Sequence, residues 1–207
     1  MTKHFDPLDY DNLGASIARA LEESPVVPLL SLKRFDGAGI YALYYTGSHP
    51  AYAPLAECNR ESPGSWALYI GKAEAENSRK GDPNQVRSSV GPKLYNRISN
   101  HLKSIEAATN IDAADFQVRA LAVAPTWIPL AEVVAIRLHH PVWNVLVDGL
   151  GNHDPGAGRY KGMRPRWDTL HPGRAWADRL QPRMETPDDV QQDTINYLRI
   201  NQSYCSL

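Results

Sequence analysis

Two short aromatic-rich runs, GIYALYY at 39–45 and WALYIGKA at 66–73, place the strongest limit on the fold. Both are dense in strand-favouring residues, and the core of the second, 66–70, is short enough to be one strand. FQVRALAV at 116–123 alternates like a half-buried strand, and VWNVLV at 142–147 predicts a final short strand. A chain with strands this short builds a small sheet that needs helices to cover it.

Three segments carry apolar residues at helical spacing: 12–23, 93–105 and the run from Pro129 to His139. We therefore predict an α/β (α+β) fold, a small, mostly antiparallel, three-stranded sheet flanked by helices. Gly, Ser and Pro between the first two strands predict a long loop or insertion over 46–65. The predicted organisation is a helical arm at 1–36, a core with inserted loops at 37–150 and a basic, Arg-rich extension at 151–207.

Composition limits the class of protein. The 207 residues, 43% of them hydrophobic, suit one compact domain with appendages. No stretch approaches 18 apolar residues and the N-terminus is polar and acidic, so neither a membrane span nor a secretory signal is expected. Cys58 and Cys205 lack metal-ligand spacing, which excludes a common cysteine-type zinc site. So few cysteines fit a reducing compartment, and we predict a cytoplasmic protein.

The net charge of −1 conceals two basic segments, 72–103 and 159–183, between acidic ends. Such segregation permits a basic face on a nearly neutral molecule. The alternative interpretation is an ordinary solvated surface.

Candidate chemical groups border the predicted core. Arg97 and His101 lie one helical turn apart beside an apolar stripe, and Lys93 continues their row. They are either cleft residues or basic side chains extending outward from an amphipathic helix. Glu132 is the only acid in PLAEVVAIRLHH. It is either a first-turn acid favoured by the helix dipole or the single carboxylate of a Mg²⁺ site.

The tyrosines of the two strand runs have two interpretations as well. They could pack in the core with their hydroxyls at the surface. As a general base, a tyrosine with an ordinary pKa of about 10 needs nearby cations to favour its anion. Lys72, Arg97 and a metal on Glu132 would supply them.

Six elements in order resemble the GIY-YIG nuclease superfamily: GIY at 39–41, YIG at 69–71, and then Arg97, His101, Glu132 and Asn144. The resemblance covers about residues 37–147, with a longer stretch between the two motifs than in compact members. VDGLGNHDPGAGR at 147–159 and WDTLHPGRAWADRL at 167–180 further resemble the type II restriction endonucleases of this superfamily that cut CCGCGG.

This resemblance implies hydrolysis of DNA phosphodiesters with one divalent metal, Mg²⁺, for which Mn²⁺ would substitute. Glu132 would hold the ion and Tyr41 would be the general base, with Tyr69 beside it. Arg97 would stabilise the transition state, and His101 would either handle protons or hydrogen-bond Tyr41. Asn144 would steady the site, and Lys72 would tune the tyrosines.

Partners follow from the same resemblance. Double-stranded DNA is the expected substrate, and a palindromic target is most simply read by a homodimer, although a tetramer is possible. A companion DNA methyltransferase would protect the host without forming a stable complex. The expected DNA contacts come from the segments 74–92, 148–158 and 159–183, and they include Lys72, Lys93, Arg159, Arg164 and Arg166.

Three alternatives stay open. One is a structure-specific or repair endonuclease of the same superfamily, and another is a DNA-binding module without catalysis. The third is a zinc protein that uses His139, His140, His153 and His171, although no recognised ligand spacing connects them.

Overall fold

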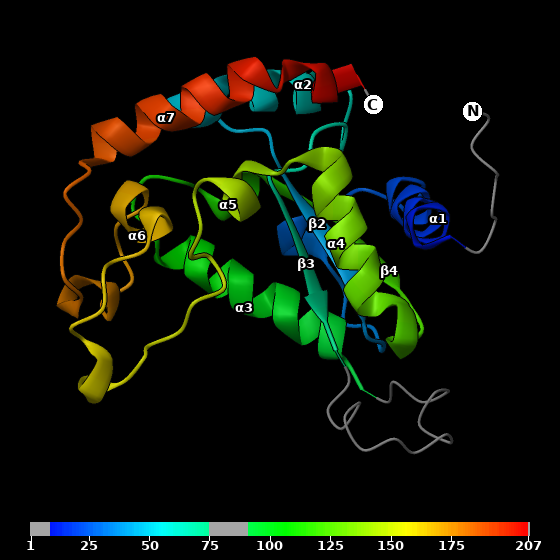
Figure 1. Cartoon of the computed structure of the whole chain (residues 1–207), viewed down its shortest axis with the longest axis horizontal. Coiled ribbons are helices and arrows are strands. Elements are labelled where there is room, and N and C mark those ends of the chain that lie inside the picture. The colour runs from blue at the N-terminus through cyan, green and yellow to red at the C-terminus, as the bar shows by residue number, and fades with distance from the viewer. Residues whose placement is uncertain (1–8, 75–90, 207) are drawn as a thin grey trace.

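The computed structural model describes residues 9–74 and 91–206 and has an antiparallel sheet at its centre (Figure 1). The strand order is β1-β4-β2-β3, with β1 at Val27–Pro28, β2 at Gly39–Tyr45, β3 at Tyr69–Ala73 and β4 at Phe116–Ala122. The predicted three-stranded antiparallel sheet is confirmed for β2, β3 and β4. The two-residue β1 adds a fourth strand beside β4.

Strand β2 is buried on both faces and divides the core into two layers. Tyr41, Leu43 and Tyr45 belong to one buried cluster, while Ile40 and Tyr44 belong to the other. This alternation follows from the two-residue period of a strand. It therefore fixes which layer each tyrosine of the strand faces.

The three predicted helices are confirmed as α1 Tyr10–Glu22, α3 Lys93–Ala107 and α4 Ile128–His139. Helix α3 lies in the layer of Tyr41 and buries Leu94, Ile98 and Ile105. Helices α1 and α4 cover the opposite layer, side by side (Figure 1). Short 3₁₀ turns occur at Leu29–Ser31, Pro50–Tyr52, Ala113–Asp115, Pro125–Trp127, Ala157–Arg159, Ala177–Arg179 and Gln202–Ser206.

The loop predicted at 46–65 is wrong in its centre, because Ala53–Glu61 forms α2. The segment's prolines suggested a loop, but Pro54 lies in the helix's first turn, where a missing N–H costs little. Leu55 and Ala56 are fully buried on its inner face. Tertiary packing therefore makes a helix of a segment whose composition is typical of a loop.

The strand predicted at 142–147 is also wrong. Val142–Val145 forms a one-turn helix, α5, after Pro141. It lies against β3, whose outer edge has no strand partner among the described residues. The backbone N–H of Trp143 donates to the carbonyl of Leu68, the residue before β3. Helix α5 thus satisfies part of an exposed strand edge.

The segment after residue 150 contributes helices α6 Arg166–Leu170 and α7 Pro187–Ile200. Helix α7 begins at a capping box formed by Thr186 and Asp189. Trp167, Val190 and Leu198 join the same buried cluster as Tyr41. The predicted division at residue 150 therefore separates segments that share one core.

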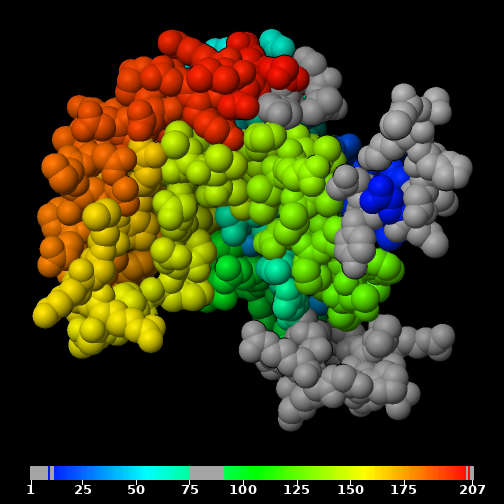
Figure 2. Space-filling model, in the orientation of Figure 1, coloured from blue at the N-terminus to red at the C-terminus, as the bar shows by residue number. Residues whose placement is uncertain are grey.

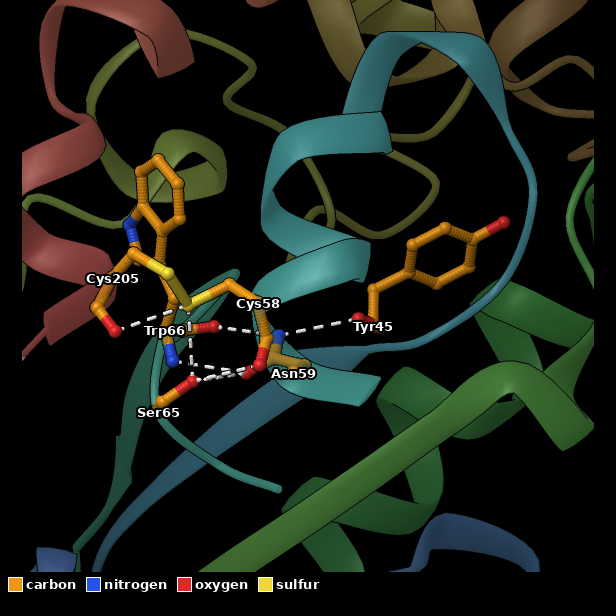
Figure 3. Close-up of a disulfide and its surroundings, with 6 residues drawn as sticks. All are labelled: Tyr45, Cys58, Asn59, Ser65, Trp66 and Cys205. Atoms are coloured by element: carbon orange, nitrogen blue, oxygen red, sulfur yellow. Dashed lines mark hydrogen bonds between the residues drawn. A yellow bond between two sulfur atoms is a disulfide. The ribbon is translucent and has the colours of Figure 1, made fainter. Parts of the chain in front are cut away.

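Cys58 and Cys205 form a disulfide that joins α2 to the last 3₁₀ turn (Figure 3). The expectation of a reducing compartment treats both residues as thiols, whereas the structure joins them. The next residue, Asn59, donates to the carbonyls of Tyr45 and Trp66 and accepts from the Trp66 N–H. Asn59 thus ties the end of β2 to the segment that leads into β3.

Among residues 9–74 and 91–206, no helix is long and apolar enough to cross a membrane.

Candidate active site

Strands β2 and β3, which contain the GIY and YIG runs, form one wall of the site, because the two strands pair directly. Tyr41 lies opposite Gly71 in the ladder. A Cβ on Gly71 would come within 2.5 Å of Tyr41 Oη and 2.8 Å of Tyr69 Cε1. The glycine therefore leaves the space in which the Tyr41 ring crosses the neighbouring strand.

Tyr41, Tyr69 and His101 form a cluster of three rings, with centroid separations of 5.2–6.1 Å. Tyr41 and Tyr69 come from adjacent strands and His101 from α3. Arg97, one turn before His101, acts electrostatically on all three rings. The structure thus brings together four of the predicted residues.

Two polar atoms of this cluster are buried without a hydrogen-bond partner in the described part of the chain: Tyr41 Oη and His101 Nε2. The prediction that core-packed tyrosines keep their hydroxyls at the surface does not hold for Tyr41. Unpaired buried polar atoms cost about 1–3 kcal/mol each. The two rings lie 5.7 Å apart between centroids, so a polar molecule that enters this cluster would find both atoms available for hydrogen bonds.

The environment keeps both groups neutral. Burial raises the pKa of Tyr41 well above its ordinary value, Tyr69 raises it further, and Arg97 opposes both effects. Burial, followed by the charge of Arg97, lowers the pKa of His101 to about 3. The Leu150 carbonyl, which accepts a hydrogen bond from the His101 ring, acts in the other direction. At neutral pH His101 is therefore an uncharged imidazole.

An open cleft of about 700 Å³ runs along the outer edge of β3. Its walls come from β3, α3 and α4. In Figure 2, β3 and α3 lie recessed between α4 and the segment after residue 150. The lining residues are Tyr69, Lys72, Ala73, Glu74, Lys93, Asn96, Arg97, Asn100 and Glu132. Because β3 is the edge strand, side chains from both faces of the sheet reach this cleft.

Glu132 projects from α4 into the cleft, with its side chain 21% exposed. Lys72 Nζ lies 3.2 Å from Glu132 and 3.0 Å from Glu74. Partial burial acts to lower the pKa of Lys72, but the two carboxylates outweigh it and raise that pKa. The cleft thus holds a lysine bridging two acids.

Asn144 does not line this cleft. Its side chain accepts a hydrogen bond from the Ile70 N–H and donates one to the Ile70 carbonyl, both at 2.8 Å. The Asn144 amide thus makes with Ile70, the residue between Tyr69 and Gly71, the two hydrogen bonds that a neighbouring strand would make. Asn144 therefore holds the YIG motif in position.

Residues 33–198 match the family described as the Eco29kI GIY-YIG domain, whose namesake is a restriction endonuclease that cuts CCGCGG. The chain belongs to this family. The Eco29kI GIY-YIG match includes β2, β3, α3, α4 and most of the extension, and it begins after α1. Comparison with curated proteins gives no match. The resemblance to a GIY-YIG restriction endonuclease is confirmed, and family membership implies a nuclease that binds double-stranded DNA.

GIY-YIG nucleases generally use divalent metals, and the donor set of the cleft fits such an ion. Mg²⁺ commonly takes one or two carboxylates and completes its shell with water and phosphate oxygens. Glu132 offers a partly exposed carboxylate, and Lys72 Nζ already shows that a cation is held beside it. No group of three or more His, Cys, Asp or Glu side chains lies at metal-binding distance in the described ranges, so the zinc alternative gains no support.

The predicted DNA contacts have different surroundings. Lys72 and Lys93 line the cleft, and exposed Arg159 lines a separate pocket of about 430 Å³. Arg164 donates to the Ala177 carbonyl, and Arg166 pairs with Glu185 and Asp193. Residues 75–90, most of the predicted contact loop 74–92, lie outside the described residues.

Sequence reasoning missed several residues of the site. Asn96 and Asn100 line the cleft and share a helical face with Lys93 and Arg97, so their spacing on α3 could have identified them. Arg174 appeared in the sequence only as one of several basic residues. No spacing rule connects it to the site.

Proposed function

We propose that the chain is a divalent-metal-dependent type II restriction endonuclease that cleaves double-stranded DNA at a short G/C-rich palindrome, CCGCGG. The observation that carries this proposal is the grouping of Tyr41, Tyr69, His101 and Arg97 beside a cleft that contains Glu132. The family match over residues 33–198 supports the choice of restriction endonuclease.

In the proposed mechanism the phenolate form of Tyr41 accepts the proton of the attacking water as that water's oxygen bonds to phosphorus. The bond between phosphorus and the departing sugar oxygen breaks, and that oxygen takes a proton from solvent water. His101, neutral and with Nε2 unpartnered, accepts a hydrogen bond from the same water and orients it. His101 is then an orienting group and not a proton carrier. Tyr69 packs beside Tyr41 and limits its movement.

Arg97 places a positive charge at the entrance to this cluster, where it stabilises negative charge on the phosphoryl oxygens in the transition state. Glu132 is the residue that would hold Mg²⁺, or Mn²⁺ in its place. When bound, the ion supplies positive charge that favours the Tyr41 anion and the departing oxygen. For Glu132 to hold the ion, the Lys72 ammonium group must leave the Glu132 carboxylate. Lys72 can then pair with a DNA phosphate.

DNA recognition is proposed for a homodimer, since two-fold symmetry of the protein matches a palindrome. Lys72 and Lys93, which line the cleft, are proposed to hold phosphates there. Arg159 is exposed, and we propose that it reaches a guanine edge. A separate methyltransferase would protect the host DNA.

Digestion of a sequenced plasmid tests the proposal. With Mg²⁺, a plasmid with CCGCGG sites should give discrete fragments whose ends map to them, and a matched plasmid with those sites mutated should stay intact. EDTA and Glu132→Ala should each abolish cleavage, while gel-shift binding is kept. Nicks or smears at unrelated positions would favour a structure-specific or repair nuclease, and binding without any cleavage would favour a DNA-binding module.

A further inference from the structure

The segment Gly149–Asn152 lies directly over the catalytic face of α3. A Cβ on Gly151 would be 3.0 Å from Arg97 Nη2 and 3.5 Å from His101 Cε1. The adjacent Leu150 carbonyl accepts a hydrogen bond from His101. The backbone of this segment therefore limits where both side chains can lie.

One arginine from the extension holds that backbone. Arg174 donates from Nη2 to the Gly149 carbonyl at 2.9 Å and from Nη1 to the carbonyls of Leu150 and Asn152 at 3.0 and 3.1 Å. Three carbonyls within four residues are thus bound by one guanidinium. The Arg174 side chain is only 4% exposed, so water does not compete for these bonds.

The guanidinium is itself fixed on its other sides. Asp168 accepts from Nε at 2.6 Å and from Nη2 at 2.5 Å. The rings of Trp167 and Trp176 lie 4.5 and 4.7 Å from Cζ. Lysine could keep the charge opposite Asp168, but it has neither the planar fork nor the stacking surface that these contacts use.

We propose that Arg174 is a positioning residue for DNA cleavage, which holds Gly149–Asn152 against α3 and so sets the places of Arg97 and His101. This inference rests on the proposed nuclease function. It gives Arg174 a role inside the protein, although Arg174 lies in the basic segment 159–183 expected to contact DNA. We call the hydrogen bonds from Arg174 to the segment Gly149–Asn152 the clamp. Through the clamp the extension affects DNA cleavage without touching the substrate.

The first test is Arg174→Lys in the full chain. Displacement of Arg97 should lower kcat on the order of 10²-fold, while KM for DNA should change by less than about threefold. Arg119→Lys is the matched control, because Arg119 also donates to a backbone carbonyl, that of Gly64, and lies over a ring, that of Tyr44. Tyr44 belongs to the opposite core layer, so this control should keep its kcat.

A second readout does not depend on cleavage. In ¹⁵N-histidine NMR spectra the pKa of His101 should rise in Arg174→Lys from about 3 towards its ordinary value near 6.5, because water reaches the ring. The groups that face His101 are Tyr41, Tyr69, Arg97, His153 and Arg174. His139, paired with Glu22 at the α1–α4 contact, should titrate as in the wild type.

Gly151→Ala tests the same proposal if the Arg174→Lys protein does not fold. It leaves the clamp intact but pushes a methyl group towards Arg97, so kcat should again fall and melting should be little changed. Wild-type kcat in a folded Arg174→Lys or Gly151→Ala protein would overturn the proposal, as would an unshifted His101 pKa in Arg174→Lys. If the wild-type protein cleaves no DNA, the proposed function fails, whereas the NMR comparison still reports on the clamp.

Discussion

Tyr41 and Gly71 lie opposite each other in the β2–β3 ladder, and the glycine leaves room for the tyrosine hydroxyl to cross the neighbouring strand. Gly71→Ala would place its Cβ 2.5 Å from Tyr41 Oη, closer than non-bonded atoms approach. We expect a folded protein whose cleavage rate falls on the order of 10²-fold, because the reacting group is displaced. Single-turnover kinetics measure this effect.

Gly158→Ala is a suitable control, because a Cβ there would meet no atom within 4 Å. Because Gly158 lies in a segment expected to contact DNA, the comparison is made at saturating enzyme concentration, where its single-turnover rate should equal that of the wild type. Full activity of Gly71→Ala would show that the place of the Tyr41 hydroxyl does not matter to the reaction.

The raised pKa of Tyr41 predicts an alkaline dependence of the cleavage step. Burial and Tyr69 hold the pKa above its ordinary value near 10, so the phenolate fraction is small and grows with pH. The single-turnover rate should rise about tenfold per pH unit from roughly pH 7 to 9. Tyr41→Phe should lose most activity, and its residual rate should lack this slope. A wild-type profile that is flat over this range would argue against Tyr41 as the base.

Asn144 should act through Ile70. Asn144→Asp keeps an acceptor for the Ile70 N–H but turns the donor that faces the Ile70 carbonyl into an acceptor. We expect a loss of about 1–3 kcal/mol in unfolding free energy and a larger fall in kcat than in DNA binding. Denaturant titration and single-turnover cleavage measure the two effects.

Asn59→Asp is the matched control, since Asn59 makes the same kind of backbone clamp near the start of β3. It should be destabilised as well, yet keep its kcat when folded. Equal losses of kcat in both variants would reduce Asn144 to a purely structural residue.

The lowered pKa of His101 predicts how the unfolding free energy changes at acidic pH. The unfolded chain protonates this histidine near pH 6.5, whereas the folded protein does so only near pH 3. Between these values the unfolded state binds one more proton, so the unfolding free energy falls with decreasing pH by up to about 1.4 kcal/mol per unit. His101→Gln should remove this contribution. Denaturant curves at several pH values test it, and parallel pH dependence in both proteins would contradict it.

Local pattern predicted much of this fold, and its failures have physical causes. GIYALYY became β2 at its predicted bounds because strand propensity and burial agree there. VWNVLV has the same propensity but follows Pro141 and meets an edge strand, where one helical turn and the Asn144 amide complete the hydrogen bonding.

The site, like the fold, could be predicted from the sequence only in part. The resemblance to the family predicted Tyr41, Arg97 and Glu132, because its motif specifies which residues occur and in which order along the chain. It could not predict that the Tyr41 hydroxyl is unpartnered or that Arg174 binds three carbonyls, since both depend on side chains that meet only in the folded chain.

The Cys58–Cys205 disulfide closes a loop of 147 residues, so its effect should be on stability and not on catalysis. It joins α2 to the 3₁₀ turn Gln202–Ser206, and neither cysteine lines the cleft beside β3. Cys58→Ser/Cys205→Ser, or reduction of the wild type, should lower the unfolding free energy by about 2–5 kcal/mol, because the unfolded chain gains freedom. The oxidised and reduced proteins, compared below their melting temperatures, should cleave DNA at equal rates, and a rate that falls with reduction would show that the bond also shapes the active site.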